Sequence, residues 1–170
     1  MKQLILLILS LIFVTNIYAC ECECNGDCSF YTGSFGCGFV ALVKVISFDD
    51  YLDSPVNGYP GKMPYSMTVE VIKKYNGLET RKKIKIWGDD GSKCRPYIGN
   101  FKLNDYYLIA PRLIGEKHIQ KEKPTDYDFF SCVTDYLSVN IKKKIAYGKF
   151  SKELNEISLT EFEKIFKIKK

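Results

Sequence analysis

The sequence predicts a mainly β protein, an antiparallel barrel or sandwich with a helix near the C-terminus. Three observations support this fold class. Several short runs are rich in β-branched residues or alternate between apolar and polar positions. Long polar segments with proline, glycine and asparagine separate these runs. The final segment instead spaces its apolar residues as an amphipathic helix does.

Four segments are expected to form strands. Residues 39–48 (FVALVKVISF) are almost entirely apolar and rich in valine and isoleucine, which is typical of a buried strand. Residues 65–75 alternate between apolar and polar side chains, as a half-exposed antiparallel strand does. Residues 82–88 alternate in the same way, and residues 105–113 are again rich in β-forming residues. Residues 136–147 are ambiguous from their pattern alone.

The helix is expected over residues 158–170. Ser158 and Glu161 have the spacing of a capping box, which marks the start of a helix. Phe162 and Phe166 then lie on one side of it. This segment should therefore pack an apolar face against the rest of the fold.

The segments between these elements carry the residues of loops and turns. Residues 25–38 are rich in glycine, serine and asparagine, and residues 49–64 contain three prolines with Asn-Gly and Pro-Gly pairs, so both are expected to be loops. Asn76-Gly77 is a turn signal between two strands. A further loop is expected after the strand at 82–88.

The N-terminus has the pattern of a signal peptide, predicted over residues 1–19. Lys2 supplies a positive charge, an apolar run follows, and Ala19 is a small residue suited to cleavage. An uncleaved anchor helix is the alternative, although the apolar run is short for a membrane span. The rest is expected to form a domain over residues 20–150 and a C-terminal helical segment over 151–170. The protein would then be extracytoplasmic, either secreted or attached to the cell envelope or outer membrane.

Charge and motif content narrow the function. The formal net charge is +5, spread in short basic runs that are typical of solvated faces, so no nucleic-acid partner is expected. The single histidine, His118, lies beside lysines in a polar segment, and no hydrolase or metalloprotease motif is present. Asp89 and Asp90 are more typical of a turn than of a catalytic pair. We therefore expect that the protein is not an enzyme and that it has no catalytic residue, bound metal or cofactor.

Seven cysteines follow the apolar run, and export makes disulfides their expected state. The cluster ACECECNGDC holds four of them but lacks the C-x2-C pairs of zinc knuckles and the C-x-x-C of a redox site. Cysteines at positions i and i+2 of an extended segment point to the same face. Such a C-x-C pair could tie one segment to two places on a sheet, and a Cys28–Cys37 bridge would close the loop at 25–38.

The order of these pieces resembles the netrin-like domain, in particular the N-terminal domain of tissue inhibitors of metalloproteinases and their bacterial relatives. The pieces are the C-x-C start behind a signal peptide, then FVALVKVISF, YSMTVEVIKKYNG, IKIWGDDGSKC, DYYLIA and FFSC, over roughly residues 20–140. The resemblance implies an OB-type five-stranded antiparallel barrel with flanking helices, here a C-terminal one, stapled by disulfides.

The resemblance also implies disulfide partners. In that family the two cysteines of the C-x-C motif bridge to a mid-chain cysteine and to a later one, and the matching positions here are Cys94 and Cys132. If the motif is Cys20 and Cys22, an odd set of cysteines is left. The other register gives three bridges: Cys22–Cys94, Cys24–Cys132 and Cys28–Cys37.

In that second register Cys20 is left over. Ile-Tyr-Ala-Cys is an imperfect match to a bacterial lipoprotein cleavage box, because a bulky tyrosine replaces a small residue. Lipidation of Cys20 would attach the protein to a membrane and would make the cysteine count even. Ordinary cleavage with one unpaired thiol is the alternative.

In the family that this chain resembles, the state of the N-terminus decides whether the protein can inhibit a metalloprotease. The resemblance implies that a free N-terminal cysteine chelates the zinc of a protease through its α-amine and carbonyl, while the next side chain enters the specificity pocket. Here that side chain would be Glu21 or Glu23, in place of a small or hydroxyl residue. An unpaired carboxylate in an apolar pocket is costly, so these residues support inhibition only weakly.

Two functional hypotheses follow. In the first, the protein is an exported binding module whose partner is a protein, in particular a zinc metalloprotease that it inhibits. In the second, it is a cell-envelope lipoprotein that binds a protein or glycan without inhibiting a protease. For the second, an aromatic surface could come from Tyr65, Trp87, Tyr106 and Tyr107, although each is more typical of a core or strand position.

Overall fold

The computed structural model describes residues 26–53, 56, 58–117 and 121–168. The predicted signal peptide, the cysteines and glutamates of residues 20–24, and His118 lie outside the described residues. Within the described part of the chain, no helix has the length and apolar character needed to span a membrane.

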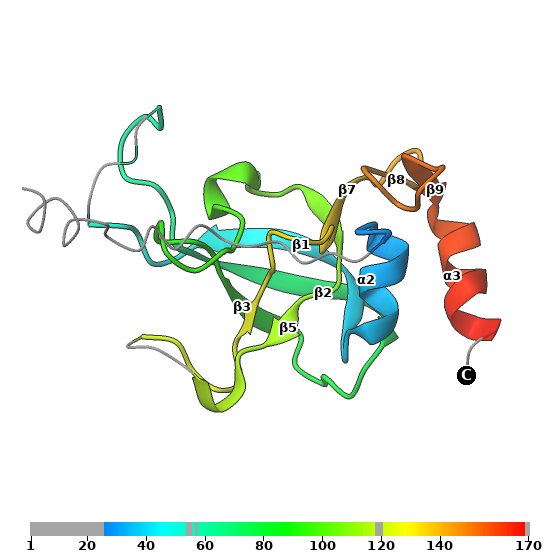
Figure 1. Ribbon diagram of the computed structural model, residues 1–170, viewed down its shortest axis with the longest axis horizontal. Coiled ribbons are helices and arrows are strands. Elements are labelled where there is room, and N and C mark those ends of the chain that lie inside the picture. Colours follow the sequence, from blue (N-terminus) through cyan, green and yellow to red (C-terminus); the bar gives the residue numbers. More distant parts are fainter. Residues whose placement is uncertain (1–25, 54–55, 57, 118–120, 169–170) are drawn as a thin grey trace, which may run out of the picture.

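The described strands form one mixed sheet of nine strands in the order β5-β6-β3-β2-β1-β4-β7-β8-β9 (Figure 1). Every neighbouring pair is antiparallel except β3 and β6, which are parallel. The strands are β1 Val40–Phe48, β2 Ser66–Asn76, β3 Lys83–Trp87, β4 Tyr106–Ile109, β5 Arg112–Leu113, β6 Tyr127–Asp128, β7 Tyr136–Asn140, β8 Ile145–Tyr147 and β9 Glu156–Ser158. The helices are α2 Phe30–Gly36 and α3 Leu159–Ile168, with short 3-10 turns η1 Ile98–Asn100 and η2 Gly115–Lys117.

Strand β1 is the centre of the fold because both of its faces are buried. Its side chains alternate between two hydrophobic cores: Val43 and Val45 enter the first, and Val40 and Leu42 enter the second. The first core also contains buried side chains from β3 and from the segments after it, including Ile86, Ile98, Phe101 and Phe129. The second core lies under the two helices and includes Phe30, Leu108, Phe150 and Phe162.

The predicted strands at 39–48, 65–75 and 82–88 are confirmed as β1, β2 and β3. The Asn-Gly turn is also confirmed: Gly77 has φ of +99°, and a Cβ there would lie 2.2 Å from the carbonyl oxygen of Gly38. Only glycine fits this close approach of two backbones. The ambiguous segment at 136–147 forms the hairpin β7–β8.

The predicted strand at 105–113 is interrupted. Its first part, β4, pairs with β1 and β7, whereas its second part, β5, pairs with β6. Ala110 and Pro111 lie between the two parts, and proline has no backbone N–H to donate to a ladder. One continuous segment therefore contacts strands on two sides of the molecule.

The loop prediction for residues 25–38 is wrong for its central part, because Phe30–Gly36 is the helix α2. Two glycines, one threonine and one serine in these seven residues are typical of a loop, and the helix forms because of its tertiary contacts. Phe30 is fully buried against Phe162, with ring centroids 5.9 Å apart. The first helical N–H groups donate to the carbonyl oxygens of Lys149 and Phe150 at 3.0 and 2.7 Å.

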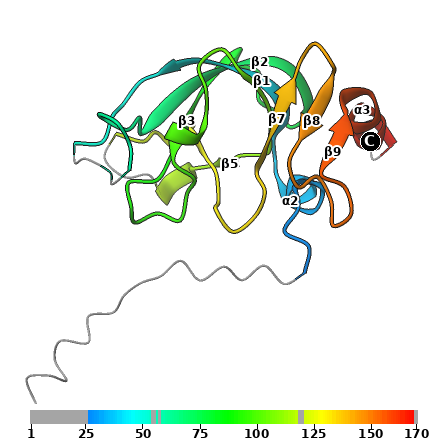
Figure 2. The ribbon, with the colours of Figure 1, turned by 90° about the horizontal axis from the view of Figure 1, so that it is seen from above.

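Helix α3 agrees with the prediction. The Glu161 N–H donates to Ser158 Oγ at 3.1 Å, and the Ser158 hydroxyl donates to Glu161 Oε2 at 2.7 Å. Phe162 and Phe166 are buried in the second core. Figure 2 shows this helix beside β8 and β9, at the end of the sheet far from β3.

The mainly β class with a C-terminal helix is thus confirmed. The sheet is an open one of nine strands in its hydrogen-bonded order, and the closed five-stranded barrel that the resemblance implies is not shown. Strands β6 and β9, of two and three residues, were not predicted from the sequence.

Candidate functional site

Three cysteines gather along one loop. Cys94 follows β3, Cys132 follows β6, and Cys28 precedes α2. The Ser131 N–H donates to the carbonyl oxygen of Cys94 at 2.9 Å, and the Thr134 N–H donates to the carbonyl oxygen of Cys28 at 2.9 Å. The loop at 131–134, which contains Cys132, therefore joins the backbones of the other two cysteines.

Cys28, Cys94 and Cys132 are each disulfide-bonded. No two cysteines in the described part of the chain are bonded to each other, and Cys37 is a free thiol. The pairings of Cys22 with Cys94 and of Cys24 with Cys132 involve residues outside the described ones.

The predicted Cys28–Cys37 bridge is wrong. The seven residues of α2 lie between these two cysteines and separate them by roughly 10 Å at the rise of an α-helix. A disulfide requires Cα atoms within about 7 Å of each other. Instead, the Cys37 Sγ donates to the carbonyl oxygen of Ala110 at 3.2 Å. Burial, followed by the nearby Asp135 carboxylate, raises the pKa of the Cys37 thiol to about 11, so this thiol stays protonated and unreactive.

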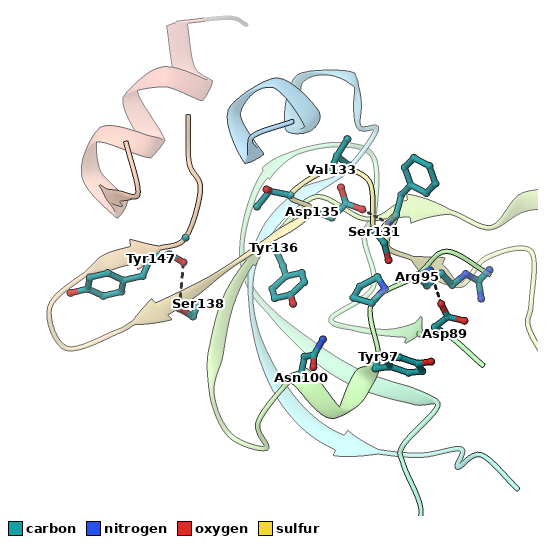
Figure 3. Close-up of a pocket in the computed structure, with 14 residues that line it drawn as sticks. Asp89, Arg95, Tyr97, Asn100, Ser131, Val133, Asp135, Tyr136, Ser138 and Tyr147 are labelled. Carbon is teal, nitrogen blue, oxygen red and sulfur yellow. Dashed lines mark hydrogen bonds between the residues drawn. The ribbon is translucent and has the colours of Figure 1, made fainter. Parts of the chain in front are cut away.

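A groove of about 660 Å³ is lined by residues next in the chain to Cys94 and Cys132. Figure 3 shows the side chains that line it. We call it the end groove. It lies between the loop after β3, the loop between β6 and β7, and the hairpin β7–β8. It is lined by Asp89, Arg95, Pro96, Tyr97, Asn100, Phe130, Ser131, Val133, Thr134, Asp135, Tyr136, Ser138, Tyr147 and Gly148. Its size falls in the range of ordinary ligand sites.

Asp89 organises the loop that carries Cys94. Its Oδ1 accepts the N–H groups of Gly91 and Lys93 at 2.6 and 3.1 Å, and its Oδ2 accepts the Arg95 N–H at 3.3 Å. Cys94 itself has φ of +54°, a conformation that residues other than glycine adopt rarely. The prediction that this aspartate belongs to a turn is confirmed, and the same turn fixes the position of Cys94.

Asp135 is the buried acid of the end groove, with 3% of its surface exposed. Its Oδ2 accepts the Phe130 N–H, and its carbonyl oxygen accepts the Ala110 N–H at 2.8 Å. Burial raises the pKa of Asp135 to about 7, although the Phe130 hydrogen bond and the charge of Arg112 oppose this rise. The carboxyl group is therefore poised to change its charge near neutral pH.

Aromatic rings form much of the remaining wall. Tyr136 and Asn100 point toward each other across the groove (Figure 3). The Tyr136 ring packs against Phe101 with centroids 4.5 Å apart, and burial raises the pKa of its hydroxyl. Rigid aromatic side chains of this kind provide apolar contact area with a polar tip, which suits binding of a peptide segment.

A buried cluster of ion pairs lies next to the end groove and includes Arg95 from its lining. Arg95, 8% exposed, contacts Glu122 at 2.5 Å and Asp128 at 2.8 Å. Lys93 adds a second contact to Glu122 at 2.9 Å, and Arg112 adds one to Asp128 at 3.1 Å. Burial tends to raise the pKa of Glu122, but the hydrogen bonds from Arg95 and Lys93 lower it overall. This cluster joins the loop after β3 to the strand β6, and sequence reasoning missed it.

The four aromatic residues proposed as a surface do not form one. Trp87 is buried, and its Nε1 donates to Asp126 Oδ2 at 2.8 Å. Tyr107 is buried in the first core against Phe101. Tyr106 packs against the second core, and only Tyr65 lies beside Trp87, with ring centroids 5.2 Å apart.

The described residues contain no group of three or more histidine, cysteine, aspartate or glutamate side chains that could hold a metal ion. The site of interest is therefore a groove flanked by disulfide-bonded cysteines, supported by buried ion pairs and lined by aromatic rings. No known protein family, curated protein or solved structure matches this chain.

Proposed function

We propose that the chain is an exported, disulfide-stapled module of the netrin-like type, and that it acts by binding a protein at its end groove rather than by catalysis. Its best candidate partner is a zinc metalloprotease. The observation that carries the proposal is the gathering of Cys28, Cys94 and Cys132 beside this groove, each disulfide-bonded and none bonded to another.

The strand pairing supports an OB-type barrel of five segments. Strands β1, β2, β3 and β6 are neighbours in that order, and β6 pairs with β5. Because β5 continues β4 along the chain, and β4 pairs with β1, residues 106–113 link the two ends of this series. The five segments then form a ring that is broken only at Ala110-Pro111, in keeping with the partly open character of OB barrels.

The cysteine count supports an N-terminus that is tied down at the groove. With Cys37 free, the three bonded cysteines need three partners, and the remaining cysteines of the chain are Cys20, Cys22 and Cys24. The register with Cys20 and Cys22 as the C-x-C pair then becomes consistent. It gives the bridges Cys20–Cys94, Cys22–Cys132 and Cys24–Cys28.

The alternative register keeps Cys22–Cys94 and Cys24–Cys132 and pairs Cys20 with Cys28. In both registers Cys20 is a disulfide partner and no thiol remains for a lipid. The count therefore favours the secreted inhibitor over the lipoprotein.

Under this proposal the mature chain begins at Cys20, next to the loop that Asp89 organises. The Cys20 α-amine and carbonyl would chelate the protease zinc and displace its catalytic water. Glu21 would then face the specificity pocket, where an unpaired carboxylate weakens binding to an apolar site.

Inhibition of a purified zinc metalloprotease by the mature chain tests the proposal. We expect inhibition by the chain that starts at Cys20, and a loss of at least about 10-fold when one alanine precedes Cys20, because the amide cannot chelate zinc as an amine does. Glu21→Thr should strengthen inhibition of a protease with an apolar pocket. Glu153→Thr, an equal change on an exposed loop, should not.

Mass spectrometry of the mature N-terminus and peptide mapping without reduction decide the alternatives. A diacylated or triacylated Cys20 would exclude zinc chelation and support the envelope lipoprotein. Bridges from Cys94 and Cys132 to two of the N-terminal cysteines would support the proposed anchoring. A Cys94–Cys132 bridge would contradict it.

A further inference from the structure

A second groove runs along the flank of β3, apart from the end groove. It consists of two hollows of about 250 and 220 Å³ that share Lys121. We call it the lateral groove. Its basic half is lined by Thr68, Arg81, Lys83, Ile84, Lys85, Lys121, Lys123 and Asp126. Its aromatic half includes Tyr51, Asp53, Tyr65, Asp90 and Lys93.

The basic half is lined by more positive than negative side chains, because Asp126 is its one acid beside five basic residues. Arg81 is paired with Glu79 at 2.6 Å, and Lys85 is paired with Asp50 at 3.0 Å. Lys83, Lys121 and Lys123 are exposed, and none of the three forms an ion pair with a described residue. Asp126 lines the same hollow, and Lys121 also acts on the Asp50 carboxylate, so the positive charge is opposed only in part. The remaining excess of exposed ammonium groups favours an anion in the hollow.

The lysines meet because of the parallel pair of strands. Lys83 begins β3, whereas Lys121 and Lys123 precede β6, nearly forty residues later in the chain. The pairing of Ile86 with Tyr127 brings the two basic segments to one flank of the sheet. The hollow thus lies where strand β3, which carries Lys83, meets the surface loop that carries Lys121 and Lys123.

The aromatic half has a different chemistry. Tyr51 is 46% exposed and presents a ring at the surface. The Tyr65 hydroxyl is fixed by contacts with Lys93 and with Asp90, the latter at 3.4 Å. Carboxylates of Asp53 and Asp90 lie in the same hollow. Exposed rings beside carboxylate acceptors suit a polyhydroxyl ligand, because the ring contacts its C–H face and the carboxylates accept its hydroxyl groups.

The two halves together select among anions. A nucleic acid carries a phosphate at every nucleotide, and its backbone would place negative charge against Asp53 and Asp90. An acidic oligosaccharide carries isolated acidic groups between neutral hydroxyl-rich parts, so it matches both halves.

We propose that the lateral groove binds an acidic oligosaccharide, with its acidic group among Lys83, Lys121 and Lys123 and a neutral sugar on Tyr51. This site does not depend on the end groove, so failure of protease inhibition would leave it unaffected.

Binding of a hyaluronan hexasaccharide, which has a carboxylate on every second sugar, tests the proposal by calorimetry on the full mature chain. Neutral chitohexaose and a thymidine oligonucleotide of similar length are the comparison ligands. We expect the hexasaccharide to bind at least about 10-fold more tightly than chitohexaose. Equal binding of the two, or no binding of hyaluronan, would overturn the proposal. Tighter binding of the oligonucleotide would replace it with a nucleic-acid site.

The variants separate a specific groove from general charge attraction. Lys83→Ala/Lys121→Ala/Lys123→Ala should weaken hyaluronan binding at least about 10-fold, because charge-assisted hydrogen bonds are lost. The matched triple variant Lys142→Ala/Lys143→Ala/Lys152→Ala removes the same charge from exposed positions elsewhere. It should change the affinity by less than about 2-fold, and an equal loss in both triple variants would refute the groove.

Tyr51 supplies the second, independent arm. Tyr51→Ala should weaken hyaluronan binding about 5-fold, whereas Tyr51→Phe, which keeps the ring, should not. If Tyr51→Ala leaves the affinity unchanged, the sugar does not lie on this ring and the proposed orientation is wrong.

Discussion

The charged groups around Arg95 and those of the lateral groove differ in burial and in pairing. Arg95 is nearly inaccessible, and its partners Glu122 and Asp128 are 3% and 7% exposed. Lys83, Lys121 and Lys123 are exposed and form no ion pair with a described residue. Buried, fully paired charges fix the loops that build the end groove. Unpaired, exposed charges contribute little to the fold and remain available to a ligand.

The largest expected effect comes from breaking the buried cluster. Arg95→Ala leaves the carboxylates of Glu122 and Asp128 buried with fewer compensating charges. The free energy of unfolding should fall by about 3–5 kcal/mol, the usual result of removing one partner from a buried ion pair. Urea unfolding at neutral pH measures this loss.

Arg112→Ala is the matched control, because Arg112 contacts the same Asp128 from a side chain that is 47% exposed. It should cost less than about 1 kcal/mol. Equal losses in the two variants would mean that burial does not distinguish these pairs.

The second effect concerns the buried acid of the end groove. Because the pKa of Asp135 is raised to about 7 in the folded chain, its contribution to stability is complete below the unfolded pKa near 3.8. That contribution is lost as the pH rises toward 7. Asp135→Asn keeps an acceptor for the Phe130 N–H and removes the titration. Its stability relative to the parent protein should therefore increase by up to about 3 kcal/mol between pH 5 and pH 8.

Urea unfolding of both proteins at pH 5 and pH 8 tests this expectation. The exposed Asp105→Asn provides the control and should show no such trend. A constant difference between Asp135→Asn and the parent across this range would show that Asp135 does not titrate there.

The smallest effect is expected in the lateral groove. The Lys83→Ala/Lys121→Ala/Lys123→Ala variant should unfold within about 0.5 kcal/mol of the parent protein, since its side chains leave no buried partner behind. Relief of their mutual repulsion should even stabilise the variant slightly at low salt. A fall of more than about 2 kcal/mol in the free energy of unfolding would show that these lysines, like Arg95, stabilise the fold.

Local pattern was enough to predict the central strands and the last helix. The alternation in residues 65–75 and the apolar run at 39–48 are strong local signals, and Ser158 with Glu161 marks the start of α3. Helix α2 could not be predicted, because its glycines, threonine and serine indicate a loop and its helical form depends on the burial of Phe30. Strand β6 is too short to show a period, and its existence depends on its pairing with β3.

In the candidate site, too, the features that depend on tertiary contacts could not be predicted from the sequence. The sequence indicated Cys94 and Cys132 through a family resemblance, but it could not show that α2 separates Cys28 from Cys37. Asp135 lies in a segment without motif, and only burial gives its carboxyl group an unusual pKa. The meeting of Lys83 with Lys121 depends on a contact between strands far apart in the chain. The sequence shows that the segments around Lys83 and around Lys121 are both basic. It does not show that the two segments lie together in the fold.

The single parallel pair, β3 with β6, also sets the order in which the chain can fold. Strands β1, β2 and β3 can pair as soon as they exist, because each follows the one before it in the chain and pairs with it directly. Strand β6 can join β3 only after about forty further residues have emerged, and contacts over such distances slow folding. Until then β3 has an open edge, which invites pairing with other chains. A partner that protects this edge before β6 is available would therefore act on a chain shorter than about 130 residues.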